Sequence, residues 1–112
     1  MDILFSSTKL AKILNSTKEL RKCYGADCGE RIGRRLDDLR AADNLAVVRK
    51  LPQMRCHELT GDRKGQLAVD AKHPQRIVFE PADEPVPKTP DGGLNWENVR
   101  TIRILEVIDY HG

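Results

Sequence analysis

Three residues able to carry chemistry lie together near the end of the chain: Asp109, Tyr110 and His111. The run before them, residues 99–108, is rich in β-branched and aliphatic side chains and predicts a buried strand. Because this run is apolar on both faces, we expect a central strand covered by helices. A carboxylate, a phenol and an imidazole held at the rim of a sheet are what a small acid–base site requires.

A second set of candidate groups lies in the middle of the chain. Residues 54–59 predict a strand in which Arg55 and His57 share one face, and Arg63 and Arg76 follow in the next turn and a later strand. Imidazole and carboxylate groups move protons near neutral pH, and guanidinium groups bind phosphate oxygens in bidentate fashion. These groups suit transesterification of RNA, in which one group deprotonates a ribose 2′-OH and another protonates the departing 5′-oxygen.

Each of these residues also has a purely structural explanation. A single histidine on a strand, such as His57, is more often a hydrogen-bonded, half-buried residue. Arg63 could simply stabilise its turn by pairing, and His73 is expected to be a turn residue. A metal site built from His57, Asp109 and His111 lacks any spaced ligand motif, so we expect neither a metal nor another cofactor.

The composition sets limits on the fold and the compartment. A chain of 112 residues buries one core, so we expect a single domain over residues 1–112 with an aliphatic interior, because only 4% of the residues are aromatic. No apolar stretch approaches the ~20 residues of a membrane span, and residues 1–5 lack the regions of a secretory signal. Three cysteines fit no disulfide framework and are typical of reduced thiols. We therefore expect a cytoplasmic protein that does not act on membranes.

The N-terminal half predicts a short strand followed by helices. Residues 1–5 fit the strand, hydroxyl side chains at 6–8 cap the first helix, and Gly25 ends the second. Asp27 is expected to cap the longest helix, which presents one apolar stripe. The expected helices cover about residues 9–14, 17–24, 27–42 and 44–51.

The C-terminal half predicts strands at 54–59, 66–72, 76–80 and 99–108. The proline- and glycine-rich segment 81–95 is expected to be a long surface connection, pinned at its far end by Leu94 or Trp96. The order predicts an α+β fold in which N-terminal helices pack on one face of a small antiparallel β-sheet. The other face is then free to carry chemistry.

At residues 57–66, 76–79 and 109–111 the chain resembles the HigB-type toxins (plasmid maintenance killer proteins) of the RelE/ParE superfamily. The similarity covers about the last half of the chain. A Gly-Asp-Arg-x-Gly hairpin and a terminal Asp-Tyr-His are fairly specific in combination, although each alone is weak. The family's catalytic positions fall here on His57, Asp109, Tyr110 and His111. Arg63 and Arg76 match arginines of the family pattern, and the expected RNA-binding residues are Arg55, Arg63, Lys64 and Arg76.

The resemblance implies a RelE/ParE-like fold and the toxin of a type II toxin–antitoxin system. Such a toxin is a metal-independent, ribosome-dependent mRNA endonuclease (an mRNA interferase) that inhibits translation. The implied partners are the ribosome, mRNA and a cognate helix-turn-helix antitoxin of the HigA type, with operator DNA reached only through the antitoxin.

Two departures from the family pattern bear on this expectation. Where HigB toxins often place a lysine before Gly-Asp-Arg, this chain has Thr60, and the loss of one charge-assisted contact costs ~1.5–3 kcal/mol unless Arg55 or Lys64 compensates. The segment 81–95 is also longer than the short hairpin expected there, and it could reach a partner or be a tolerated surface loop. The alternative is a non-catalytic or degenerate toxin that acts by protein binding, through gyrase inhibition or autoregulation with the antitoxin.

Overall fold

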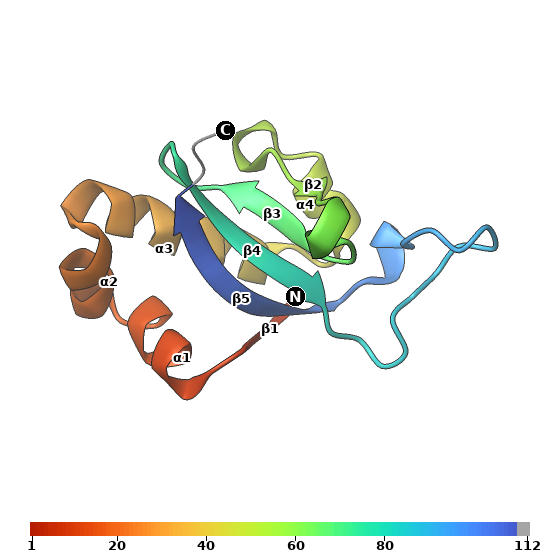
Figure 1. Cartoon of the computed structure of the whole chain (residues 1–112), viewed down its shortest axis with the longest axis horizontal. Coiled ribbons are helices and arrows are strands. Elements are labelled where there is room, and N and C mark those ends of the chain that lie inside the picture. The colour runs from red at the N-terminus through yellow and green to blue at the C-terminus, as the bar shows by residue number, and fades with distance from the viewer. Residues whose placement is uncertain (110–112) are drawn as a thin grey trace.

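The computed structural model describes residues 1–109 of the chain (Figure 1). Its helices are α1 (Thr8–Leu14), α2 (Thr17–Tyr24), α3 (Ala26–Ala41) and α4 (Leu45–Arg49). Its strands are β1 (Asp2–Phe5), β2 (His57–Glu58), β3 (Leu67–Asp70), β4 (Gln75–Pro81) and β5 (Thr101–Asp109). Single 3₁₀ turns cover Pro52–Met54, Gly61–Arg63 and Trp96–Asn98. No helix within residues 1–109 is both long enough and apolar enough to cross a bilayer.

The strands form one sheet in the order β1-β5-β4-β3-β2. The predicted α+β class and the central position of the last strand are confirmed. The sheet is mixed rather than wholly antiparallel, because β1 pairs with β5 in parallel, with Ile3 opposite Ile102. The sequence pattern of residues 1–5 identifies a strand but carries no information on which neighbour that strand selects.

The helices begin close to where the capping residues predict. The side-chain oxygens of Ser7, Ser16 and Asn44 accept hydrogen bonds from backbone N–H groups in the first turns of α1, α2 and α4. Gly25, at φ +85°, ends α2 as expected and immediately precedes α3. The expectation that Asp27 caps α3 is wrong, because the helix already begins at Ala26 and Asp27 lies inside its first turn.

The hydrophobic core lies between the helices and one face of the sheet. The predicted apolar stripe of α3, Ile32, Leu36 and Leu39, is at most 1% exposed, and in Figure 1 α3 runs behind the sheet. The sheet contributes Leu67, Val69, Ile77, Phe79, Ile102 and Ile104 to the same cluster. The opposite face of the sheet is therefore turned away from α3.

The segment 81–95 is ordered by its own hydrogen bonds. Thr89 N donates to Gly93 O at 2.8 Å and Asn95 N donates to Pro87 O at 3.0 Å, which closes a small hairpin. Both anchors expected from the sequence are confirmed, since Leu94 and Trp96 pack against the core. The guanidinium carbon of Arg49 in α4 lies 4.5 Å from the ring centroid of Trp96. This loop projects to the right in Figure 1.

Candidate active site

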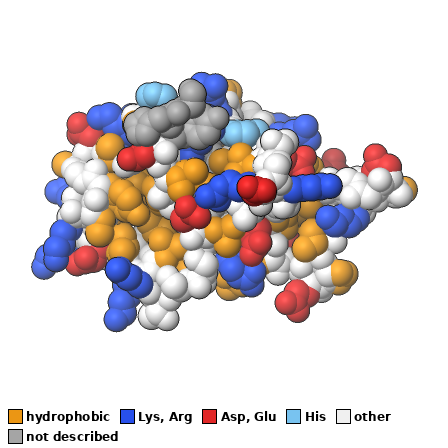
Figure 2. Space-filling view, in the orientation of Figure 1, with side chains coloured by type: hydrophobic (Ala, Val, Ile, Leu, Met, Phe, Trp, Pro, Cys, Tyr) orange, Lys and Arg blue, Asp and Glu red, His pale blue; other side chains and the backbone are white. Residues whose placement is uncertain are grey.

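The open face of the sheet carries four of the eight predicted site residues, namely His57, Arg55, Arg63 and Arg76. His57, Ala68, Val78 and Glu106 lie opposite one another in a row across β2, β3, β4 and β5. The strand alternation places Asp70, Arg76 and Ile108 on the same face, two residues further along. Figure 2 views this face, on which histidine, basic and acidic side chains are interspersed.

The imidazole of His57 is oriented by the backbone of Arg55. Arg55 has φ +46° and ψ +45°, in the left-handed region that bulky residues rarely adopt. Its carbonyl oxygen lies 2.8 Å from His57 Nδ1, and because a carbonyl can only accept, Nδ1 carries the proton of this hydrogen bond. The second ring nitrogen, Nε2, then has its lone pair available, as a general base requires.

The same turn explains why the predicted strand 54–59 is only two residues long. Met54 is fully buried at the end of a 3₁₀ turn, and the left-handed Arg55 interrupts extended backbone. Only His57 and Glu58 pair with β3. The prediction of a six-residue strand is therefore wrong, whereas His57 and Arg55 do lie next to each other.

Asp70 holds two of the predicted RNA-binding arginines. Arg76 Nε lies 3.1 Å from Asp70 Oδ1, and Arg55 Nε lies 3.4 Å from Asp70 Oδ2. The buried Arg35 of α3 donates from Nε to the backbone oxygen of Asp70 at 3.0 Å. Sequence analysis missed Asp70. The register of the hairpin formed by β3 and β4 places Asp70 directly opposite Arg76, and counting residues outward from the turn would have predicted this pair.

Arg63 spans the open face from the turn before β3 to the strand β5. Its Nη2 lies 3.3 Å from Glu106 Oε2, and its Nη1 donates to Gln66 Oε1 at 2.9 Å. Ala68 and Val78, in the row that ends at Glu106, are at most 1% exposed. Glu106 was also missed, because nothing in the sequence of β5 marks it as the residue that faces Arg63.

The charges of the site are therefore largely balanced among the described residues. Three arginines face two carboxylates, and Lys64 alone among the four predicted RNA-binding residues forms no ion pair with any residue in 1–109. A guanidinium group has five N–H donors, and the contacts that Arg55 and Arg63 make within residues 1–109 use only part of that number. The carboxylates thus orient these two arginines and leave them able to bind a phosphate.

The C-terminal candidates are only partly placed. Asp109 is the last residue of β5 and lies opposite Gln75. The alternation of β5 directs Asp109 to the face opposite that of Ile108 and Arg76. Tyr110 and His111 lie outside the described residues. The structure thus brings His57 together with Arg55, Arg63 and Arg76 on one face, and it does not bring the side chain of Asp109 to that face.

The part of the chain that the structure describes holds no cluster of three or more His, Cys, Asp and Glu side chains suited to a metal ion.

Cys56, between Arg55 and His57, points to the core side of the chain and should be chemically protected. Burial raises the pKa of its thiol to about 12, from a model-compound value of 9.0. The reactive thiolate is then suppressed about 1,000-fold, whereas Cys23 is exposed on α2. Iodoacetamide at pH 8, followed by mass spectrometry of the peptides, should label Cys23 within minutes and leave Cys56 unmodified until the protein is unfolded. Equal labelling of both thiols in the native protein would contradict this placement.

Comparison with solved structures finds a likeness of fold. No family model matches the chain, and no curated protein sequence matches it. Among solved structures, the chain is similar to a YoeB/ParE toxin from Agrobacterium tumefaciens, with a TM-score of 0.58 over 99% of this chain and 100% of that chain. The two sequences are 10% identical, so the likeness is one of fold. The chain therefore has the α+β fold of RelE/ParE-type toxins.

Proposed function

We propose that this protein is the toxin of a type II toxin–antitoxin system and that it cleaves mRNA on the ribosome. The observation that carries the proposal is the open sheet face, on which the imidazole of His57 and the side chains of Arg55, Arg63 and Arg76 all lie. The fold shared with a YoeB/ParE toxin supports it, as does the resemblance of the motifs to HigB-type toxins.

The chemistry would be an acid–base transesterification. His57 Nε2 takes the proton of a ribose 2′-OH, the 2′-oxygen attacks the adjacent phosphorus, and the bond from phosphorus to the 5′-oxygen breaks. The arginines stabilise the negative charge that develops on the phosphorane oxygens. The acid that protonates the departing 5′-oxygen is assigned to His111 or Tyr110, and Asp109 is assigned to orienting them. The products are a 2′,3′-cyclic phosphate and a free 5′-OH.

Lys64 could replace the positive charge of the lysine that HigB-type toxins often carry at the position of Thr60. Thr60 and Lys64 line the same cleft, so Lys64 supplies a cation beside the position where HigB-type toxins often carry theirs.

The proposed partners follow from this function. They are the ribosome and its mRNA in the cytoplasm, and an antitoxin of the helix-turn-helix HigA type that alone would contact operator DNA.

Controlled expression in bacteria tests the proposal. Induction of the chain should arrest growth within one or two generations, and primer extension on abundant mRNAs should reveal new 5′ ends in register with codons. Co-expression of an adjacent small helix-turn-helix reading frame should restore growth. Arrest with intact mRNA would reject the nuclease.

A second candidate function is a toxin that acts by binding a protein such as DNA gyrase. The observation that favours it is the small net positive charge of the candidate site. Asp70 pairs with Arg76, Glu106 pairs with Arg63, and Thr60 stands where HigB-type toxins often carry a lysine. An in vitro supercoiling assay separates the two functions. Inhibition of gyrase by the purified chain, without mRNA cleavage, would favour the binding protein.

A further inference from the structure

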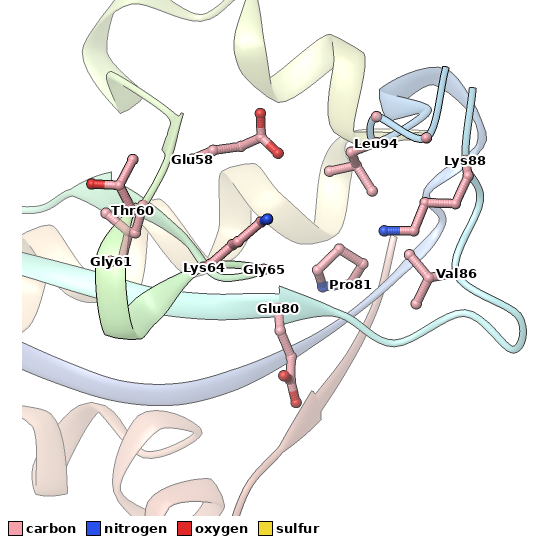
Figure 3. Close-up of a pocket in the computed structure, with 13 residues that line it drawn as sticks. Glu58, Thr60, Gly61, Lys64, Gly65, Glu80, Pro81, Val86, Lys88 and Leu94 are labelled. Atoms are coloured by element: carbon pink, nitrogen blue, oxygen red, sulfur yellow. The ribbon is translucent and has the colours of Figure 1, made fainter. Parts of the chain in front are cut away.

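A cleft with a volume of about 580 Å³ lies beside the candidate active site (Figure 3). It opens between the turn at 60–65, the end of β4 and the hairpin at 86–94. Its volume falls in the range of ~300–1,000 Å³ that small-molecule sites occupy. The side chains that define it come from segments distant in the sequence: Glu58, Lys64, Pro81, Val86, Lys88 and Leu94.

Two lysines point into this cleft. Figure 3 shows the ammonium groups of Lys64 and Lys88 directed into the space from opposite walls, and neither forms an ion pair within the described residues. Glu80 also borders the cleft, but its carboxylate points away and lies 3.2 Å from Arg103 Nη1. Glu58 is thus the carboxylate that faces the two cations, and it too has no ion-pair partner in residues 1–109.

The remaining walls are apolar and held in place. Pro81, Val86 and Leu94 are half-buried, so each still presents hydrophobic surface to the cleft. Leu94 packs against the core and pairs with Lys88 across the hairpin. A wall supported in this way is preorganised, and a ligand need not order it on binding.

The cleft and the candidate active site share one turn of the chain. This turn contains Arg63 and Lys64. Arg63 extends over the open sheet face to Glu106, while Lys64, the next residue, lines the cleft. A strand of RNA on the open face would therefore pass next to the cleft. This continuity favours a nucleic-acid ligand over a separate peptide.

We propose that the cleft binds a nucleotide that flanks the scissile bond of the RNA, which makes the loop 81–95 a substrate-binding element. Lys64 and Lys88 contact the phosphate, and Pro81, Val86 and Leu94 pack against the base. Glu58 accepts a hydrogen bond from an exocyclic amino group, as carboxylates do with cytosine N4. This inference rests on the proposed function, because it assumes that RNA lies on the open face.

Binding to short RNA tests the inference without any cleavage. The probe is fluorescein-labelled hexacytidylate, and the background is the full chain with His57→Ala. Adding Lys88→Glu should weaken binding about tenfold at 50 mM salt, because a cation that contacts phosphate becomes an anion. Adding Lys18→Glu, the same charge change at an exposed lysine of α2 far from the cleft, should alter affinity less than twofold. Equal effects of the two substitutions would overturn the inference.

Base choice gives a second readout. Hexacytidylate should bind about threefold or more tightly than hexauridylate, which has no amino group, and Glu58→Gln should shrink that ratio. No measurable RNA binding, or tighter binding of a ten-residue glutamate peptide that Lys88→Glu abolishes, would reject the nucleotide site.

These outcomes separate the two proposals. If wild-type protein cleaves mRNA while Lys88→Glu binds normally, the cleft inference fails and the nuclease stands. If wild-type protein never cleaves mRNA but Lys88→Glu selectively weakens RNA binding, the cleft inference stands and the nuclease fails.

Discussion

Replacing His57 with alanine should lower the rate of mRNA cleavage by ~10²–10⁴-fold, the usual contribution of a positioned general base. Nδ1 of this ring is held at 2.8 Å by the carbonyl oxygen of Arg55, so only Nε2 is free to take a proton. His57→Ala should leave the fold intact, because the side chain is only half-buried and makes one hydrogen bond within residues 1–109. The rate should be measured with purified ribosomes and a defined mRNA.

The matched control is His73→Ala. His73 is exposed in the turn between β3 and β4, away from the row of residues that contains His57, so its loss should change the rate less than threefold. Equal rates for both variants, with unchanged circular dichroism, would remove His57 from the mechanism.

Replacing Gly29 with alanine should destabilise the protein by about 2–3 kcal/mol. A Cβ at this position would lie 2.7 Å from Leu20 O and 2.8 Å from Leu20 C, both backbone atoms of α2. The clash can be relieved only by moving α2 away from α3, which would open the core around the buried Leu20. Urea unfolding followed by circular dichroism measures the loss.

Gly33 provides the control one turn further along α3. A Cβ there would meet only Leu20 Cδ1, at an ordinary 3.6 Å. Gly33→Ala should therefore stabilise the chain by ~0.5–1 kcal/mol through helix propensity. Equal stabilisation by both substitutions would show that α2 and α3 do not approach as closely at Gly29 as the structure has them.

Local signals in the sequence predicted the local structure well. Ser7 accepts the expected capping hydrogen bond, and Gly25 ends α2 at a positive φ. The apolar stripe of α3 and the central β5 followed from periodicity, because burial on one face or on two leaves different patterns. These features depend on residues close together in the chain.

Features that depend on distant pairing were harder to predict. The parallel pairing of β1 with β5 joins residues about a hundred positions apart, and nothing in residues 1–5 specifies that partner. The left-handed conformation of Arg55 makes the expected strand shorter. It could not be predicted from the sequence, because residues other than glycine rarely adopt that conformation.

The residues of the candidate site likewise fall into those that the sequence predicted and those that only the strand register reveals. The three arginines and His57 were identified from their types and motif, and the structure brings them onto one face, whereas Lys64 lines the neighbouring cleft. The carboxylates that orient them, Asp70 and Glu106, were missed because their roles arise only from strand register. The face on which Asp109 lies also depends on that register, and it differs from that of Arg76.

The central claim is that this protein cuts RNA through the ribose 2′-oxygen. The most direct measurement uses purified ribosomes programmed with an mRNA that carries one 2′-deoxynucleotide at the mapped cleavage site. The account predicts cleavage of the all-ribose message to a 2′,3′-cyclic phosphate and a 5′-OH, and no cleavage at the deoxy position. Cleavage of the deoxy message, or products with a 3′-OH and a 5′-phosphate, would contradict it.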